Sequence, residues 1–211
     1  MTDVKICGLS DPDNLATAID AGARYVGFVF YPPSPRNVSF DIAWNLARAV
    51  PTGVRSVGLF VNPDDELLER VLTGIQLDMV QLHGDETPGR INEIKERFSM
   101  PVMKAIRVAS ENDLGGLDGI QSAADWLLFD AKPPNATLPG GTGETFDWTI
   151  LKDRHFKKPW MLSGGLNAQN VGEALSILKP NAVDISSGVE SGPGKKDPDK
   201  IKEFINAVKA A

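Results

Sequence analysis

The sequence predicts one α/β domain over residues 1–211, folded as a closed eight-stranded (β/α)8, or TIM, barrel. Three observations favour this fold. Short apolar runs alternate with segments of helical spacing, the chain holds eight such units, and the composition does not change between its two halves. An open doubly wound sheet also alternates strands and helices, but eight regular units favour a sheet that closes on itself.

The eight predicted strands are short runs rich in apolar and β-branched residues. Several of them are apolar almost throughout, which is typical of parallel strands that helices cover on the outside. The runs cover residues 4–7, 25–30, 54–61, 79–83, 101–108, 125–131, 159–165 and 182–188.

The segments between these strands carry signals for the start of a helix. Pro63 fits a first helical turn, and apolar residues then recur with a 3.6-residue period until Gly74. Because 211 residues are few for a barrel of about 250, one or two helices should be abbreviated, and the helix after the fifth strand is expected to be weak. Helices are expected to begin at or just after Asp11, Asn62, Thr87, Asn167 and Asp197.

Composition limits the class of protein. Asp and Glu outnumber Lys and Arg by 28 to 22, and the net charge of −6 argues against a nucleic-acid partner. The short basic stretches GKK near residue 195 and FKKP near residue 157 are expected to be solvated turns. No stretch approaches the roughly 20 apolar residues of a membrane span and no signal peptide is visible, so we expect a cytoplasmic protein.

The few sulfur and imidazole side chains bear on cofactors. A single cysteine cannot form an internal disulfide, which fits a reducing compartment, and two histidines argue against a His-rich metal site. We therefore expect no His-rich metal site.

Two glycine-rich loops follow the seventh and eighth predicted strands, at the end of the barrel where such folds place their chemistry. They contain Gly164 and Gly165, and Ser187 and Gly188. These glycines could serve tight turns alone. However, exposed backbone N–H groups in two adjacent loops bind phosphate in barrels of this type, so the sequence predicts a small phosphorylated ligand.

Cys7 and Asp130 end the first and the sixth predicted strands. A lone cysteine is more often a small buried apolar residue than a catalytic one. An acid that follows the four apolar residues WLLF, however, has little reason to be there unless it points into a site. A thiol base and a carboxylic acid that face each other can work as an acid–base pair if burial raises the pKa of the carboxyl and local dipoles lower that of the thiol.

Arg36 and His83 follow the second and the fourth predicted strands. Flanking prolines restrict the loop that carries Arg36, and its guanidinium could hold a carboxylate with two parallel hydrogen bonds. His83 could contact substrate, or it could simply form hydrogen bonds at the end of its strand.

Asp184 is a candidate with two possible roles. Strand periodicity places Lys5 on the face of Cys7 and Asp184 on the face of Ser186, on strands that become neighbours when the barrel closes. A buried charge needs a partner, so the pairing of Lys5 with Asp184 is favoured over a contact between Asp184 and substrate hydroxyls.

The longest irregular stretch, residues 132–146, follows the sixth strand and includes Gly140, Gly141, Thr142 and Gly143. A loop of this length in a small barrel is usually a lid or a binding loop.

Eight motifs along the chain, from residue 4 to about residue 200, together resemble the phosphoribosylanthranilate isomerase family of tryptophan biosynthesis. The motifs are KICGL, GFVFYPPSPRNVS, VGLFVN, VQLHGDE, LLFDAK, GGTGETFDW, LSGGLN and VDISSGVESGPGKKD. No single motif is decisive, but their ordered combination is specific. The resemblance implies an Amadori rearrangement of N-(5-phosphoribosyl)anthranilate to 1-(2-carboxyphenylamino)-1-deoxyribulose 5-phosphate, without metal or organic cofactor.

The resemblance also implies roles for individual residues. Asp130 matches the general acid of the family, Cys7 its general base, and Arg36 the arginine that holds the anthranilate carboxylate. The loops around Gly164–Gly165 and Ser187–Gly188 match the phosphate site, and residues 140–143 match the mobile loop over the active site.

Two other functions remain open from the residues themselves. The chain could be a related sugar-phosphate isomerase, or a barrel that binds a phosphorylated metabolite without catalysis. Turnover that depends on Cys7 and Asp130 would distinguish these alternatives. A single sequence shows no interface, so both a monomer and a homodimer are compatible with it.

Overall fold

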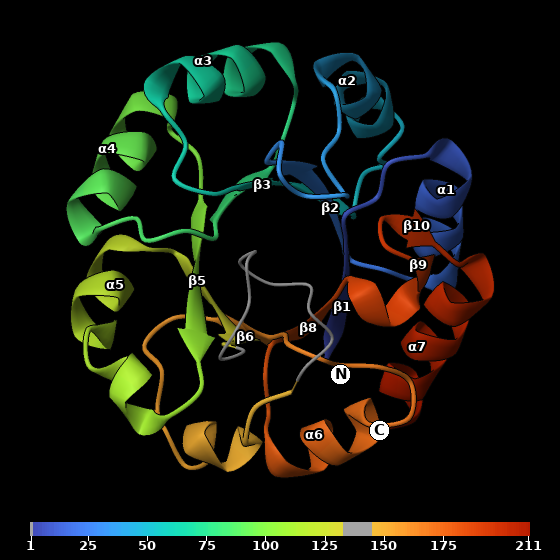
Figure 1. Cartoon of the computed structure of the whole chain (residues 1–211), viewed down its shortest axis with the longest axis vertical. Helices are drawn as coiled ribbons and strands as arrows, with labels where there is room; N and C mark the ends of the chain where they lie inside the picture. Colours follow the sequence, from blue (N-terminus) through green and yellow to red (C-terminus); the bar gives the residue numbers. More distant parts are fainter. Residues whose placement is uncertain (1, 133–144) are drawn as a thin grey trace.

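Eight parallel strands close into a barrel in the computed structural model, which describes residues 2–132 and 145–211 (Figure 1). Strand order follows the chain, and β1 pairs with β8 to complete the ring. The predicted (β/α)8 architecture is therefore confirmed. The strands are β1 (Asp3–Cys7), β2 (Tyr25–Phe30), β3 (Arg55–Phe60), β4 (Met79–Leu82), β5 (Val102–Val108), β6 (Trp126–Ala131), β7 (Trp160–Leu162) and β8 (Ala182–Ile185).

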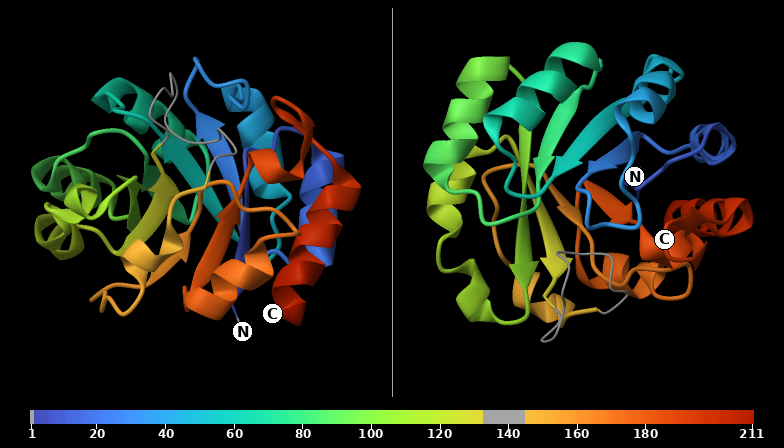
Figure 2. Two further views of the ribbon diagram at one scale, coloured as in Figure 1. Left: turned by 60° about the horizontal axis from the view of Figure 1, so that its bottom comes forward. Right: turned by 45° about the horizontal axis from the view of Figure 1, so that its top comes forward.

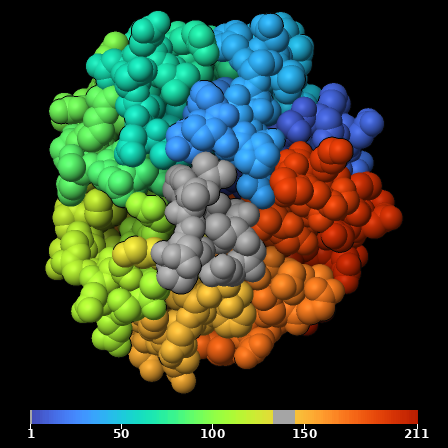
Figure 3. Space-filling model, viewed as in Figure 1, coloured from blue at the N-terminus to red at the C-terminus, as the bar shows by residue number. Residues whose placement is uncertain are grey.

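Helices surround the barrel in the order of the chain, and the surface colours of Figure 3 follow the same order around the molecule. They are α1 (Pro12–Ala21), α2 (Phe40–Arg48), α3 (Asp65–Gly74), α4 (Pro88–Phe98), α5 (Leu117–Ala123), α6 (Val171–Ile177) and α7 (Pro198–Ala210). Between β6 and β7 the described residues form only a short 3₁₀ helix, η2 (Trp148–Leu151), which matches the expected abbreviation. Helices α1 and α7 pack side by side (Figure 2).

Three of the predicted helix starts are confirmed in detail. Asp11, Thr87 and Asp197 are the N-caps of α1, α4 and α7, and each side chain accepts a hydrogen bond from a backbone N–H in the first turn. A proline occupies the first turn of each of these helices, where its missing N–H costs no hydrogen bond. The weak helix expected after the fifth strand is present as η1 (Glu111–Leu114) followed by the seven-residue α5.

Two predicted helix starts are too early, one by two residues and the other by three. The N-cap of α3 is Asp64, because Asn62 has a positive φ of 45° and its Oδ1 accepts a hydrogen bond from the backbone N–H of Asp85. The N-cap of α6 is Asn170, and Asn167 instead accepts the backbone N–H of Asn170 in the preceding turn. Both asparagines stabilise the loop before the helix, a role that competes with capping.

The barrel interior consists of stacked layers of side chains. One buried layer lies in the middle of the barrel, and Cys7, Val29 and Leu59 form a second buried group nearer the carboxyl ends of the strands. Because side chains on a strand alternate between its two faces, Asp130 shares the inner face of Leu128. The middle layer consists of Tyr25, Val57, Met79, Met103, Ala105, Leu128, Met161 and Ala182.

The chain also forms a small hairpin that the sequence analysis did not predict. Strands β9 (Glu190–Gly192) and β10 (Lys195–Lys196) pair antiparallel after the 3₁₀ helix η3 (Ser187–Val189) and before α7. Among the described residues, no helix is both long enough and apolar enough to cross a membrane.

Candidate active site

Asp130 lies at the carboxyl end of β6, buried inside the barrel with 3% of its surface exposed. Its Oδ2 is 3.0 Å from Nε2 of His83, and its Oδ1 accepts the backbone N–H of Ala131 at 2.9 Å. The Nδ1 of His83 is in turn 3.0 Å from Nε2 of Gln81. Of the two roles considered for His83, the structure therefore shows hydrogen bonding at the strand end, and a contact with substrate stays a prediction.

Cys7 ends β1 above a buried ion pair. The Nζ of Lys5 lies 2.8 Å from Oδ1 of Asp184, and these residues are also register partners between β1 and β8. The Oγ of Ser163 donates to the other carboxylate oxygen at 3.2 Å. The favoured pairing of Lys5 with Asp184 is thus confirmed, whereas a contact between Asp184 and substrate stays a prediction.

The surroundings of the Cys7 thiol do not activate it. Burial raises the pKa of Cys7 above its ordinary value, the Lys5 ammonium acts to lower it, and the Asp184 carboxylate raises it further. The expectation of a lowered thiol pKa is therefore wrong for this state, because the sulfur is desolvated. Burial alone would lower the pKa of Lys5, but Asp184 and Cys7 together raise it. At neutral pH Cys7 is accordingly a protonated thiol beside a charged lysine.

Arg36 is held over the site by a carboxylate from the small hairpin. Its Nε and Nη2 donate to the two carboxylate oxygens of Glu190 at 2.7 and 2.8 Å. Although burial would raise it, the pKa of Glu190 is lowered by its contacts with Arg36 and with Lys196. The hairpin therefore fixes the orientation of the guanidinium, a function that the sequence analysis did not assign to it.

Lys196 links this ion pair to the end of β1. Its Nζ donates to Glu190 at 2.8 Å and to the carbonyl oxygen of Ser186 at 2.9 Å, while the Oγ of Ser186 donates to the carbonyl oxygen of Cys7 at 3.0 Å. Burial lowers the pKa of Lys196. The prediction of a solvated turn for GKK is wrong for Lys196, which is 7% exposed. The buried partner of Lys196 is Glu190, a carboxylate that the short basic stretch GKK does not reveal.

The two glycine-rich loops meet beside Asp130. A hollow at the carboxyl ends of β6, β7 and β8 is lined by Asp130 and Asp184 together with all four of the predicted phosphate-site residues. Gly164 has a φ of +88°, and a Cβ atom at this position would lie 2.4 Å from the backbone nitrogen of Ala131. Only glycine allows this close approach of the loop to β6. The residues lining the hollow are Asp130, Ser163, Gly164, Gly165, Leu166, Asp184, Ile185, Ser186, Ser187 and Gly188.

A buried ion pair anchors the loop after His83. Glu86 accepts the backbone N–H groups of Asn62 and Gly84, and one of its oxygens lies 3.0 Å from Nζ of Lys104. Burial lowers the pKa of Lys104, and Glu86 opposes this effect. Glu86 thereby connects the loops that follow β3 and β4 to Lys104 of β5.

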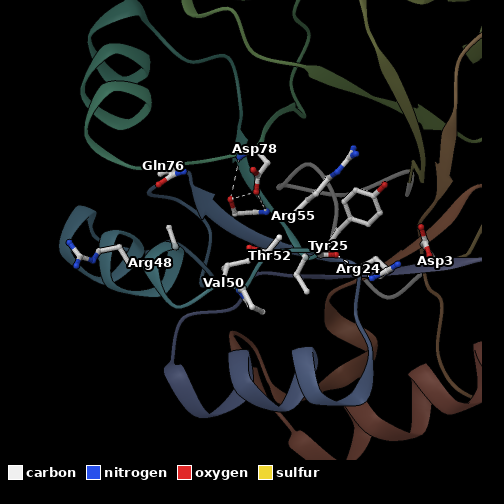
Figure 4. A pocket seen from close by; sticks show the side chains of 14 residues that line it. Asp3, Arg24, Tyr25, Arg48, Val50, Thr52, Arg55, Gln76 and Asp78 are labelled. Atoms are coloured by element: carbon white, nitrogen blue, oxygen red, sulfur yellow. Dashed lines mark hydrogen bonds between the residues drawn. The ribbon is translucent and has the colours of Figure 1, made fainter.

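A much larger cavity, of about 830 Å³, lies at the opposite end of the barrel (Figure 4). It is lined by residues at the amino ends of β1 to β3 and before β4, among them Tyr25, Arg55 and Asp78. The Asp78 carboxylate accepts both the backbone N–H and the Oγ–H of Ser56 there. None of the predicted site residues lines this cavity, and chemistry in such barrels takes place at the other end.

Metal ligands and the predicted lid complete the description of the site. Over residues 2–132 and 145–211, no group of three or more His, Cys, Asp or Glu side chains is arranged to hold a metal ion. The predicted lid residues Gly140, Gly141, Thr142 and Gly143 lie outside the described residues.

Comparison with known proteins gives the family. A family model described as N-(5'phosphoribosyl)anthranilate (PRA) isomerase matches residues 4–207. The chain belongs to the N-(5'-phosphoribosyl)anthranilate isomerase family. It is 57% identical over 203 residues to the isomerase of Paracoccus denitrificans, and the matched region covers 96% of this chain and 94% of that protein.

Solved structures of the isomerase family have the same fold over their whole length. The chain is similar to the isomerase crystal structure from Thermotoga maritima, with 40% identity, a TM-score of 0.90 and complete coverage of both chains. A second isomerase structure, in complex with reduced 1-(o-carboxyphenylamino)-1-deoxyribulose 5-phosphate, is 38% identical with a TM-score of 0.86 and complete coverage of both chains. The suggested resemblance to this isomerase family is therefore confirmed.

Within this isomerase fold, three buried polar residues close to the predicted site were not among the predicted site residues. Gln81 contacts His83, and Glu190 contacts Lys196. Glu190 also contacts Arg36, and Lys196 also contacts Ser186. A signal for Gln81 was available, because strand periodicity places it two residues before His83 on the inner face. No comparable signal existed for Glu190, since its partner Arg36 is 154 residues away in sequence.

Proposed function

We propose that Asp130 and Cys7 are the general acid and the general base of the reaction that this chain, as a member of the family, catalyses. That reaction is the isomerisation of N-(5'-phosphoribosyl)anthranilate in tryptophan biosynthesis. One observation carries the assignment of Asp130. Its buried carboxyl group lines the same hollow as both glycine-rich loops. Cys7 lies on the inner face of β1, which is separated from β6 by β7 and β8 in the closed barrel.

The proposed chemistry has two proton transfers. Asp130 gives a proton to the ribose ring oxygen, the bond from that oxygen to carbon 1 breaks, and the nitrogen lone pair forms a Schiff base. The Cys7 sulfur then takes the proton from carbon 2, whose electrons move to give an enolamine that tautomerises to the ketone. Both steps need positioned groups with access to one substrate, which is general acid–base catalysis.

The charges around the hollow support an anionic, two-ended substrate. Backbone N–H groups around Gly164–Gly165 and Ser187–Gly188 bind the phosphate, and Arg36 binds the anthranilate carboxylate in this proposal. Arg36 and Lys196 share the single carboxylate of Glu190, so this cluster brings one net positive charge to this end of a chain whose net charge is −6. An anion is therefore attracted locally, although the overall charge of the protein opposes it.

The resting state of Cys7 requires a change during the reaction. Burial raises the pKa of the thiol, so its proton has to leave before the sulfur can remove the proton from carbon 2. Asp184 orients Lys5 beneath Cys7 and, through its second oxygen, also binds Ser163 next to the phosphate loop. In this proposal Asp184 therefore positions groups of the site, and a direct contact with substrate hydroxyls remains its alternative role.

The wider setting of the enzyme is part of the same proposal. We infer a cytoplasmic enzyme without cofactor that works as a monomer or a homodimer, with one small phosphorylated substrate and no nucleic-acid partner. The residues Gly140, Gly141, Thr142 and Gly143 are assigned to a lid from the sequence alone. His83 is assigned to the wall of the substrate site, where its ring edge completes the surroundings of Asp130.

The deciding experiment follows the fluorescence of freshly generated phosphoribosylanthranilate with the native protein, Cys7→Ala and Asp130→Asn, with a chelator present. Each variant should lower kcat by about two to four orders of magnitude, which is the usual contribution of a positioned acid or base. Asp85→Asn is the matched control, because Asp85 lies at the same end of the barrel but is exposed and pairs with Arg107.

Each outcome of this experiment has a defined meaning. Near-native turnover by Asp85→Asn together with the loss in the other two variants would support the proposed roles. Near-native turnover by Cys7→Ala or Asp130→Asn would refute the role of that residue. Native protein that binds a phosphorylated analogue without turnover would instead favour a binding function.

A further inference from the structure

A buried chain of hydrogen bonds runs from Gln81 through His83 to Asp130. Gln81 is fully buried, and His83 and Asp130 are 4% and 3% exposed. The Gln81 Nε2 is 3.0 Å from Nδ1 of His83, and the His83 Nε2 is 3.0 Å from Oδ2 of Asp130. Both ring nitrogens of His83 are therefore occupied, one by an amide and one by the carboxyl group to which the catalytic proton is assigned.

The orientation of the Gln81 amide decides where the imidazole proton lies. The amide oxygen of Gln81 is buried and has no hydrogen-bond partner in the described part of the chain. In the reversed orientation the NH₂ group would occupy that position, and two N–H donors would be left without partners there. A buried acceptor without a partner is tolerated better than buried N–H groups without partners. The NH₂ group therefore faces His83, and Nδ1 of the ring accepts.

An imidazole whose Nδ1 accepts carries its proton on Nε2. The Nε2–H of His83 then donates to Oδ2 of Asp130. A carboxylic acid cannot keep its own proton on an oxygen that faces an N–H donor at this distance. The acidic proton of Asp130 is thereby confined to Oδ1, which can still accept the backbone N–H of Ala131 through its remaining lone pair.

We propose that Gln81 is a positioning residue that acts through His83 to hold the transferable proton of Asp130 on Oδ1. This inference rests on the proposed role of Asp130 as general acid. With the opposite tautomer, the lone pair on Nε2 of His83 would accept the acidic proton at Oδ2 and keep it from the substrate. After transfer, the Asp130 carboxylate has two donors in place, His83 Nε2–H and Ala131 N–H, so the product state of the acid needs no rearrangement.

The alternative to this inference is that Gln81 only fills space between the apolar middle layer and His83. The two explanations differ in what a Met side chain would do, because Met has a similar length and no hydrogen-bond donor. If packing is the only role, Gln81→Met should leave the His83 tautomer and kcat unchanged. If Gln81 fixes the tautomer, the same change should allow the Nδ1–H form and reduce the fraction of productive acid.

The first measurement is ¹⁵N NMR of histidine-labelled native protein at neutral pH. The chain has two histidines, and His155→Gln removes the exposed one, so the His83 ring signals are assigned without ambiguity. The inference requires a neutral His83 ring with its proton on Nε2 and a lone pair on Nδ1. A proton on Nδ1, alone or together with one on Nε2, would overturn it. This measurement needs no variant of Gln81.

The second measurement is steady-state kinetics of Gln81→Met. We expect kcat to fall on the order of tenfold while KM stays within about twofold, because part of the 10²–10⁴-fold benefit of a positioned acid is lost without a change in binding. Gln121→Met is the matched control, since Gln121 is also buried and its amide oxygen accepts the Lys157 N–H far from the site. This control should keep the native kcat.

The kinetic outcomes separate this inference from the proposed function. Full activity of Asp130→Asn would refute the role of the acid itself. A low kcat for Asp130→Asn with a native kcat for Gln81→Met would overturn only the positioning role of Gln81. In the Asp130→Asn background, Gln81→Met should cause no further loss, because it acts through that carboxyl group, and an additive loss would contradict the inference.

Discussion

The buried ion pair between Lys5 and Asp184 allows a prediction that separates a structural role from a substrate contact. Lys5 is completely buried, and Nζ lies 2.8 Å from the Asp184 carboxylate, which is also nearly completely buried. Asp184→Asn would leave the Lys5 ammonium without its counter-charge inside the barrel. The change is nearly isosteric, so the loss would come from electrostatics and not from a cavity.

Breaking such a buried pair from one side costs about 3–5 kcal/mol, because an uncompensated charge remains in a medium of low polarity. For a chain of this size each kcal/mol lowers Tm by about 2–4 °C, so Asp184→Asn should lower Tm by about 6–20 °C. The double variant Lys5→Met/Asp184→Leu removes both charges and keeps side chains of similar shape. It should recover most of the lost stability, because apolar pairs often replace buried ion pairs without loss.

Urea unfolding and thermal unfolding, both followed by circular dichroism, measure the stability of the three proteins. A loss below about 1 kcal/mol for Asp184→Asn would refute the reasoning, because that is the value of an exposed ion pair. The KM of the double variant then tests the other role. If Asp184 contacts substrate hydroxyls, the KM of the double variant should rise even though its stability has returned. An unchanged KM would mean that Asp184 has only the structural role.

Two further predictions follow from the charges around the site. Arg36→Ala should raise KM by about ten- to hundredfold with a smaller change in kcat, because a charged hydrogen-bonded contact contributes about 1.5–3 kcal/mol. Steady-state kinetics with a substrate analogue that lacks the aromatic carboxylate should show no such rise in KM. An equal rise with this analogue would contradict the assignment of Arg36 to the carboxylate. Cys7 and Lys5 contribute stability that is lost as pH rises above about 9, because their raised pKa values make these two groups hold their protons longer in the folded chain than in the unfolded chain, whereas the lowered pKa values of Lys104 and Lys196 act in the opposite direction. The urea midpoint should therefore fall less for Cys7→Ala than for the native protein between about pH 9 and the ordinary lysine pKa of 10.5. The same pH profile of the urea midpoint for both proteins would contradict this prediction.

The fold was predictable because its signals are local and repeat eight times. Apolar runs place the strands within about two residues of their observed bounds, except for the shorter β7 and β8, where glycines extend the pattern past the last paired residue. The predicted starts of α3 and α6 were wrong, and for α3 the reason is a contact between two different loops. Asn62 accepts the N–H of Asp85, which lies on a different loop and has no trace in the local sequence.

The site was predictable to the extent that strand alternation determines which residues face inward. That rule places Cys7, Asp130 and Asp184 inside the barrel, and it brings Lys5 opposite Asp184 once β1 and β8 pair. Glu190 could not be found in this way. It reaches Arg36 through a hairpin of only three and two residues, too short for any periodicity, and its basic partner Lys196 is indistinguishable in sequence from the exposed Lys195.

The state of the Cys7 thiol connects the stability of the barrel with the chemistry proposed for it. Burial keeps the pKa of Cys7 above its ordinary value, Lys5 acts to lower it, and Asp184 raises it. Lys5 is therefore shared between a carboxylate that neutralises it and a sulfur that it could help to ionise. A small shift of the ammonium from Asp184 toward the sulfur would favour the thiolate at the moment of proton abstraction, whereas a tighter ion pair would weaken the base. It follows that Lys5→Met/Asp184→Leu should regain stability but not the native kcat, because the cation that opposes burial of the thiolate is gone.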